Sequence, residues 1–215
     1  MVKLTMAELE KAFPHKKPRP NQKKALQLIA NSPKGLLMEM PTGEGKTATF
    51  LAALRASAAK GKGPNFYVTT TKTQVEQIAK THGDKVLVML GRAEYPCLYY
   101  EDLGYEINAE ESPCYFLKCS HRVDQETGKV AKKGETPCPY YLQKYLVRHH
   151  GKGQVVVTTA AFYLVNRILV PGWQEMEPAL VCVDEVHNLP KVARRIFQYT
   201  LTDSSFPLSG HAQAN

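Results

Sequence analysis

Near the start of the chain, a lysine and a threonine follow a glycine-rich segment in a pattern typical of phosphate binding. The segment Met40-Pro41-Thr42-Gly43-Glu44-Gly45-Lys46-Thr47 lies between a strand predicted at 35–40 and a helix predicted at 46–60. Glycines let backbone N–H groups converge on phosphate oxygens, while Lys46 would reach the β- and γ-phosphates and Thr47 would ligate Mg²⁺. The sequence therefore predicts a nucleotide-binding loop. The alternative is a glycine-rich turn that carries a surface lysine.

Two acidic residues, Asp184 and Glu185, directly follow an apolar run at 179–183. Ligands of open α/β sheets bind at the carboxyl ends of the strands, so these side chains are candidates for the same site. We expect Asp184 to hold Mg²⁺ and Glu185 to polarise the water that attacks the γ-phosphate, with His187 sensing that phosphate. The alternative is an acidic strand end that caps the next helix.

Four cysteines form a second group with metal-binding potential. Cys97, Cys114, Cys119 and Cys138 lie within 42 residues, separated by 16, 4 and 18 residues. Four thiolates can enclose an iron–sulfur cluster or a Zn²⁺ ion. Structural zinc usually uses closer cysteine pairs, so the spacing favours the cluster, while zinc stays open with His121 as a substitute ligand. The fifth cysteine, Cys182, stands between valines and is interpreted as a core residue.

The elements that must position these residues alternate along the chain. Apolar strands are predicted at 35–40, 66–69, 85–90, 154–158 and 179–183, separated by helices, a pattern typical of a parallel α/β sheet. The alternation stops between residues 91 and 150, where cysteine, proline and tyrosine dominate. We therefore predict a discontinuous α/β domain, residues 1–90 and 151–215, with residues 91–150 inserted into it.

Composition narrows the class of protein. The chain has 215 residues, 43% of them hydrophobic, and a net charge of +8. It has neither an apolar run long enough to cross a membrane nor a secretory signal, so we expect a cytoplasmic protein, in the nucleoid or nucleus, without a membrane partner. The positive charge is concentrated in residues 1–60, which suits a polyanion such as nucleic acid or nucleotide; the alternative is a solubilising surface.

With these features in place, the chain resembles the iron–sulfur DNA helicases of superfamily 2, the XPD/DinG group. Residues 39–47 resemble motif I, and residues 184–187 (Asp-Glu-Val-His) resemble the DEAH-type motif II. Residues 91–97 and 138–141 are similar to the G-R-x-x-Y-x-C entry and the C-P-Y exit of the family's cluster domain. An upstream R-x-x-Q element ends at Gln22, and residues 67–74 resemble motif Ia. The resemblance covers residues 15–200.

The resemblance implies a RecA-like P-loop NTPase sheet with an inserted four-cysteine iron–sulfur domain. It also implies a 4Fe–4S cluster on the four insertion cysteines, adenine recognition by Gln22, and ATP-driven 5′→3′ movement on single-stranded DNA. The start of the helix near residue 72 would contact DNA phosphates through Thr71, Lys72 and Thr73. Aromatic residues of the insertion could stack on bases or form its core; these are Tyr99, Tyr100, Tyr105, Tyr115 and Phe116.

The sequence ends soon after motif II, before the motifs of a second RecA-like domain. We therefore expect this chain to bind ATP and to hydrolyse it poorly, with a second helicase domain either supplied in trans or lost by truncation. Two alternatives stay open. One is a catalytically incomplete nucleic-acid-binding fragment, and the other is a zinc-bearing P-loop NTPase.

Overall fold

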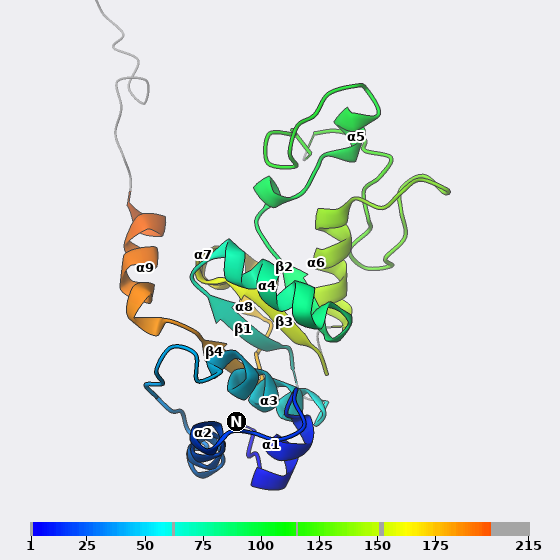
Figure 1. The fold of residues 1–215 in the computed structure, drawn as a ribbon. Coiled ribbons are helices and arrows are strands. Elements are labelled where there is room, and N and C mark those ends of the chain that lie inside the picture. The colour runs from blue at the N-terminus through cyan, green and yellow to red at the C-terminus, as the bar shows by residue number, and fades with distance from the viewer. Residues whose placement is uncertain (1, 62, 115, 151–152, 199–215) are drawn as a thin grey trace, which may run out of the picture.

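A parallel sheet forms the centre of the molecule. The computed structural model describes residues 2–61, 63–114, 116–150 and 153–198 (Figure 1). Within them, four strands pair in the order β2-β3-β1-β4, and every pair is parallel. The strands are β1 (Asn65–Thr69), β2 (Val86–Met89), β3 (Val155–Thr159) and β4 (Leu180–Val183).

Helices cover both faces of this sheet, with α3 and α4 on one face and α6, α7 and α8 on the other (Figure 1). No helix in the described part of the chain is long and apolar enough to cross a lipid bilayer. The helices are α1 (Met6–Ala12), α2 (Pro20–Asn31), α3 (Lys46–Ala58), α4 (Lys72–His82), α5 (Leu98–Glu101), α6 (Pro139–His150), α7 (Ala160–Leu169), α8 (Pro171–Gln174) and α9 (Leu189–Phe197).

Burial on both faces explains why the strands are continuous apolar runs. All five residues of β1 are buried, and Val155, Val156 and Val157 of β3 are at most 1% exposed. Leu51 of α3 and Val75 of α4 pack on one side of these strands. Parallel strands that are covered by helices on both faces have sequences of β-branched and apolar residues, without alternation of apolar and polar positions. The architecture confirms the predicted α/β, RecA-like fold class.

The strand predicted at 35–40 is wrong. Residues 36–40 have no regular secondary structure, Leu37 is 83% exposed, and β4 is the edge of the sheet. Instead, a cavity of about 450 Å³ separates the segment 33–38 from β4, and both of them line it. The apolar run there is short, because Gly35 and Glu39 bound it, so pairing with β4 would bury little apolar surface.

A helix that the sequence analysis did not predict closes the inserted segment. Residues from 91 to 138 form a lobe beyond the sheet, and α6 leads back from this lobe and packs beside β2 (Figure 1). Val147 of α6 is 1% exposed and lies in the same cluster as Met89 and Val156. The last part of the segment predicted as an insertion thus belongs to the helical layer on the sheet.

The amino-terminal helix begins with a reciprocal cap. The Glu8 carboxylate accepts the Thr5 backbone N–H at 2.8 Å, and the Glu8 backbone N–H donates to the Thr5 hydroxyl at 3.3 Å. The Lys60 ammonium lies 3.0 Å from the same carboxylate. The hydrogen bonds from Thr5 and Lys60 lower the pKa of Glu8 from its ordinary 4.5 to about 2. The charged form of Glu8 is therefore the form that stabilises the start of α1.

The substitution Glu8→Gln tests this charge, because glutamine keeps the hydrogen bond to Thr5. A carboxyl whose pKa is lowered by folding adds stability above its unfolded pKa of about 4.5, and this stability is lost as the pH falls through about 2. We expect the melting temperature at pH 7 to fall by about 1–2 °C, and the difference to narrow below pH 4.5. Thermal unfolding followed by circular dichroism measures it.

The control is Glu10→Gln on the same helix, whose carboxylate lies 3.9 Å from Lys23. It should change the melting temperature less than Glu8→Gln. A Glu8→Gln difference that stays constant from pH 7 to pH 3 would contradict the role of the charge.

Candidate nucleotide-binding site

The glycine-rich loop has a backbone that only glycine adopts without strain. Gly43 and Gly45 have φ angles of +84° and +79°, and α3 begins directly after Gly45. A Cβ atom on Gly45 would clash with the Gln22 Nε2 atom, so any other residue here would displace the Gln22 amide as well as strain the backbone. The first N–H groups of a helix have no partner within it and carry partial positive charge. The loop thus turns these donors toward the site where a phosphate would lie.

The structure brings Lys46 and Glu185 together from segments 139 residues apart. The Lys46 Nζ atom lies 2.6 Å from the Glu185 Oε1 atom, and both side chains are about a quarter exposed. The hydrogen bond raises the pKa of Lys46 and lowers the pKa of Glu185. Both groups are therefore charged at neutral pH, and the predicted convergence of the loop and the acidic pair is present in the structure.

Asp184 is buried and held from two sides. Its backbone N–H donates to the Val68 carbonyl at 2.8 Å, so the residue continues the β4 pairing with β1. Its Oδ1 atom accepts the Glu185 N–H at 3.0 Å, and its Oδ2 atom accepts the Tyr67 hydroxyl at 2.9 Å. The Tyr67 hydroxyl also lies 3.4 Å from the Thr47 Oγ1 atom. The two residues predicted to hold Mg²⁺, Thr47 and Asp184, are thus joined through one phenol.

The chain reverses direction at Glu185, the described non-glycine residue with a positive φ, +53°. A left-handed conformation costs free energy in a residue with a side chain, and such residues concentrate at functional sites. Here the turn directs the carboxylate back toward Lys46. His187 follows in a short 3-10 turn, Val186–Asn188, where its Nδ1 atom lies 3.5 Å from Glu185 and its side chain is 70% exposed.

Gln22, predicted to read adenine, uses both ends of its amide inside the protein. Its Oε1 atom accepts the Arg19 backbone N–H at 2.8 Å, and its Nε2 atom donates to the Gly45 carbonyl at 3.4 Å. The Arg19 guanidinium also donates to the Gly43 carbonyl at 3.2 Å. The start of α2 therefore supports the phosphate loop, a role that the sequence analysis missed. Adenine recognition by Gln22 stays a prediction.

Tyr67 is the other residue that the sequence analysis missed in this site. The sequence places it at the start of a segment similar to motif Ia and gives no reason to link it to Mg²⁺. One feature could have pointed to it. Tyr67 is the single tyrosine in a strand whose residues are all buried, and a buried tyrosine hydroxyl usually has a hydrogen-bond partner.

The four insertion cysteines have free thiols, and three of them are buried. Burial raises the pKa of Cys119 and of Cys138; nearby Cys114 and Cys97 raise that of Cys119 further, and Cys119 and Cys114 that of Cys138. The four thiols therefore lie in the same part of the lobe. Among the described residues, however, no three of them have sulfur atoms within 4.8 Å of one another.

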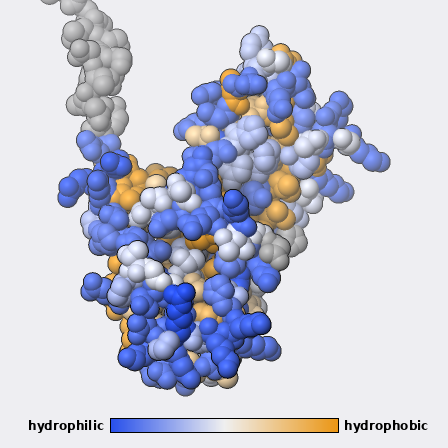
Figure 2. Space-filling model, in the orientation of Figure 1, coloured by the Kyte–Doolittle hydropathy of each residue, from blue (hydrophilic) through white to orange (hydrophobic). Residues whose placement is uncertain are grey.

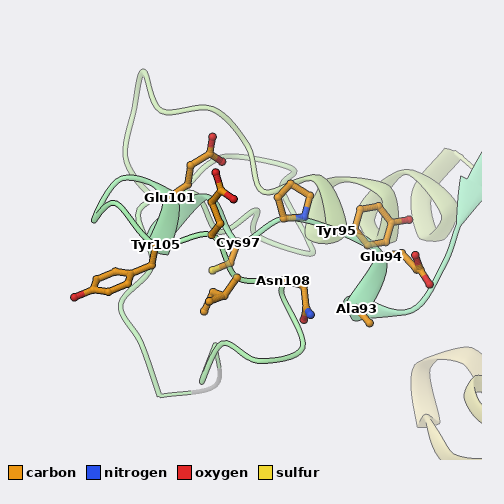
Figure 3. Close-up of a pocket in the computed structure, with 10 residues that line it drawn as sticks. Ala93, Glu94, Tyr95, Cys97, Glu101, Tyr105 and Asn108 are labelled. Atoms are coloured by element: carbon orange, nitrogen blue, oxygen red, sulfur yellow. The ribbon is translucent and has the colours of Figure 1, made fainter.

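A tetrahedral Zn²⁺ with bonds of about 2.3 Å needs sulfur atoms about 3.8 Å apart, so no three of the described cysteine thiols are arranged as a zinc site in this structure. The Cys97 side chain lines an open pocket of about 430 Å³ together with Glu101, Tyr105 and Asn108 (Figure 3). The four cysteines supply the thiolate ligands that either a zinc ion or an iron–sulfur cluster takes.

His121, the substitute zinc ligand of the sequence analysis, has other partners. Its Nδ1 atom lies 2.8 Å from the Thr136 carbonyl and its Nε2 atom lies 2.8 Å from the Asp102 carboxylate. Burial opposes a charge on the imidazole, but these hydrogen bonds outweigh it and raise the pKa of His121. The nearby Glu135 pairs with Lys132 at 2.7 Å. His121 thus belongs to a charge-balanced group beside the cysteines.

The surface predicted to contact DNA is partly occupied by internal contacts. Thr71 caps α4, and the Lys72 ammonium forms ion pairs with Glu76 and with Glu94 at the entry to the inserted lobe. Tyr100 makes edge-to-face contacts with the rings of Tyr99 and Tyr105. These contacts favour a structural role for the three rings.

Phe116 differs from those tyrosines because it is 91% exposed, so its ring is available to a partner. Tyr115, another of the predicted stacking residues, lies outside the described residues. The visible surface of the lobe is mainly hydrophilic, with small apolar patches (Figure 2).

Comparison with known protein families gives a match to ResIII, described as "Type III restriction enzyme, res subunit", over residues 15–210. The matched range includes the phosphate loop, the buried sheet, the inserted lobe and the acidic pair. The match therefore covers every residue of the candidate site.

The ion pair at the site predicts the effect of Glu185→Gln on nucleotide binding. A phosphate oxygen that binds Lys46 would compete with the Glu185 carboxylate for one ammonium and would be repelled by that carboxylate. Removing the charge should tighten the binding of a non-hydrolysable ATP analogue about two- to fivefold, the range of a partly exposed ion pair. Isothermal titration calorimetry with Mg²⁺ present measures the affinity. Weaker binding by Glu185→Gln would contradict the competition.

Proposed function

Because the chain belongs to the ResIII family, whose members carry a superfamily 2 helicase-like domain, we propose that it is the first motor domain of an ATP-dependent DNA helicase. Family membership indicates ATP-dependent helicase or NTPase activity on nucleic acid. The single observation that carries the proposal for this chain is the 2.6 Å contact of Lys46 with Glu185, next to Thr47 and Asp184. A phosphate loop and a strand-end acid pair that meet in this way suit ATP hydrolysis.

Each residue of the site has a distinct part in this chemistry. The loop N–H groups and Lys46 would bind the β- and γ-phosphates, and Thr47 with Asp184 would hold Mg²⁺, which offsets negative charge on the phosphates. Glu185 keeps its charge because Lys46 lowers its pKa, so it can accept a hydrogen bond from the attacking water and orient it. His187, exposed beside Glu185, would contact the γ-phosphate.

We propose that DNA is the polyanion that the domain binds. The resemblance to the XPD/DinG group implies that the enzyme moves along it in the 5′→3′ direction. The N-terminus of α4 presents Thr71, Lys72 and Thr73 on the surface, where backbone N–H groups suit phosphates. A second helicase domain in trans would supply an arginine finger, which raises turnover about 10³–10⁵-fold in related phosphoryl-transfer enzymes.

The substitution Lys46→Ala tests the site. Binding of a fluorescent ATP analogue by the full chain should be lost, because the loop loses the ammonium that lies beside the acid pair. Lys34→Ala, an exposed lysine before the loop, is the matched control and should bind like wild type. Lys46→Ala binding at the wild-type affinity would refute the proposed site. DNA-stimulated turnover after addition of a second helicase domain separates a motor from a catalytically incomplete binding fragment.

We also propose that residues 91–150 form an inserted domain between residues 1–90 and 151–215, and that its four cysteines ligate a 4Fe–4S cluster. Support comes from four free thiols in one lobe, three of them buried, which are the ligands that an iron–sulfur cluster takes, and from the resemblance to the XPD/DinG group. The lobe has only a small apolar core of its own, centred on Val123 and Tyr141. Ligation by Cys97, Cys114, Cys119 and Cys138 would therefore add much of its folding free energy.

The substitution Cys114→Ser tests the ligand set in protein purified without oxygen. Iron and sulfide content and visible absorbance should fall sharply, while the far-UV circular dichroism of the sheet is kept. Cys182→Ser removes a thiol from the edge strand β4, where it packs against the core away from the lobe, and should leave the iron content unchanged. Bound zinc in place of iron in the wild type would overturn the cluster in favour of a zinc-bearing NTPase.

A further inference from the structure

The centre of the sheet contains a tyrosine whose hydroxyl ends at the candidate magnesium site. Tyr67 is the third residue of β1, paired in register with Val157 of β3 and Cys182 of β4. Its side chain is 1% exposed, and its ring packs edge-to-face against Phe50 of α3 at 5.9 Å. Strands on both sides and a helix above therefore fix the ring, and only the hydroxyl reaches the carboxyl edge of the sheet.

The hydroxyl contacts two residues from different parts of the chain. It lies 2.9 Å from the Asp184 Oδ2 atom and 3.4 Å from the Thr47 Oγ1 atom. A cavity of about 280 Å³ opens beside these three residues and Gly45. The phenol thus stands where the end of β4, the start of α3 and an open space meet.

The number of protons on the two hydroxyl groups determines which group donates in each hydrogen bond. A phenol has one proton, and the ionised carboxylate is the stronger acceptor, so Tyr67 donates to Asp184. The Thr47 hydroxyl is then left to donate its proton to the phenol oxygen. That arrangement turns the lone pairs of the Thr47 oxygen away from Tyr67, where they are free to bind a cation.

We propose that Tyr67 is a positioning residue for Mg²⁺, which sets the separation and orientation of Thr47 and Asp184 through its hydroxyl. This inference rests on the proposed function, because it assigns Mg²⁺ to those two residues. Asp184 has its other oxygen fixed by the Glu185 N–H at 3.0 Å. Loss of the phenol contact would leave the carboxylate free to rotate and Thr47 free to turn its oxygen lone pairs away from the metal.

The substitution Tyr67→Phe removes the hydroxyl and keeps the ring. Binding of a fluorescent ATP analogue to the full chain is measured as Mg²⁺ is titrated. Second-sphere partners of metal ligands change metal affinity about 10–100-fold, so we expect the half-saturating Mg²⁺ concentration to rise about tenfold. Nucleotide affinity at saturating Mg²⁺ should return close to the wild-type value. An unchanged midpoint, or affinity that stays reduced at every Mg²⁺ concentration, overturns the inference.

Matched variants separate this inference from the proposed function. Tyr163→Phe removes a half-buried phenol on α7, where the ring contacts Phe66, and should leave the Mg²⁺ midpoint unchanged. Lys46→Ala should abolish binding at every Mg²⁺ concentration; if it does not, the proposed function fails. If Lys46→Ala abolishes binding and Tyr67→Phe leaves the midpoint unchanged, only the role of Tyr67 fails.

A double-mutant cycle provides a test that does not depend on the size of any single effect. Residues that act through a shared contact have non-additive effects on the property they control. Thr47→Ala should therefore raise the Mg²⁺ midpoint by a smaller factor in the Tyr67→Phe protein than in the wild type. Additive changes in the midpoint would show that Tyr67 does not act through Thr47.

Discussion

The parallel pairing of β1 with β3 and β4 is the constraint on which the site depends. The register places Val68 opposite Val183, and the next residue, Asp184, donates its backbone N–H to the Val68 carbonyl. Parallel strands end at one edge, so the residues after β4 must lie beside the end of β1. Helix α3 packs on the same strands and begins at that edge. Lys46 and Glu185 meet because α3 begins and β4 ends at this edge.

One carboxylate at this edge is neutralised by an ion pair and the other is not. Lys46 has Glu185 as its ion-pair partner and Asp184 as a second nearby negative charge. The buried Asp184 carboxylate receives neutral donors, a backbone N–H and a phenol, and no described side chain neutralises it by direct ion pairing. A buried carboxylate with hydrogen bonds but no cationic partner is well suited to a divalent ion, since the ion supplies the missing charge.

The parts of the fold that could be predicted are those encoded locally. Glycines before Lys46, and acids after a valine-rich run, identify the two halves of the site by residue type and position alone. The prediction of a strand at 35–40 is wrong because an apolar run indicates that a segment can be buried, but does not indicate which element it packs against. Helix α6 was missed because its apolar residues, such as Val147, are few and lie among tyrosines and basic residues. The contacts of Gln22 and Tyr67 depend on tertiary packing, which cannot be inferred from the periodicity of apolar residues in the sequence.

The lobe is tied to the rest of the α/β fold at both of its ends. At its start, Glu94 pairs with Lys72 at the beginning of α4, the helix predicted to contact DNA. At its end, Cys138 directly precedes α6, whose Val147 packs beneath β2. The thiols lie between these two attachments, in a lobe with little apolar core. Because one attachment is an ion pair and the other a packed helix, a change in lobe packing would reach α4 through Lys72 and the sheet through α6.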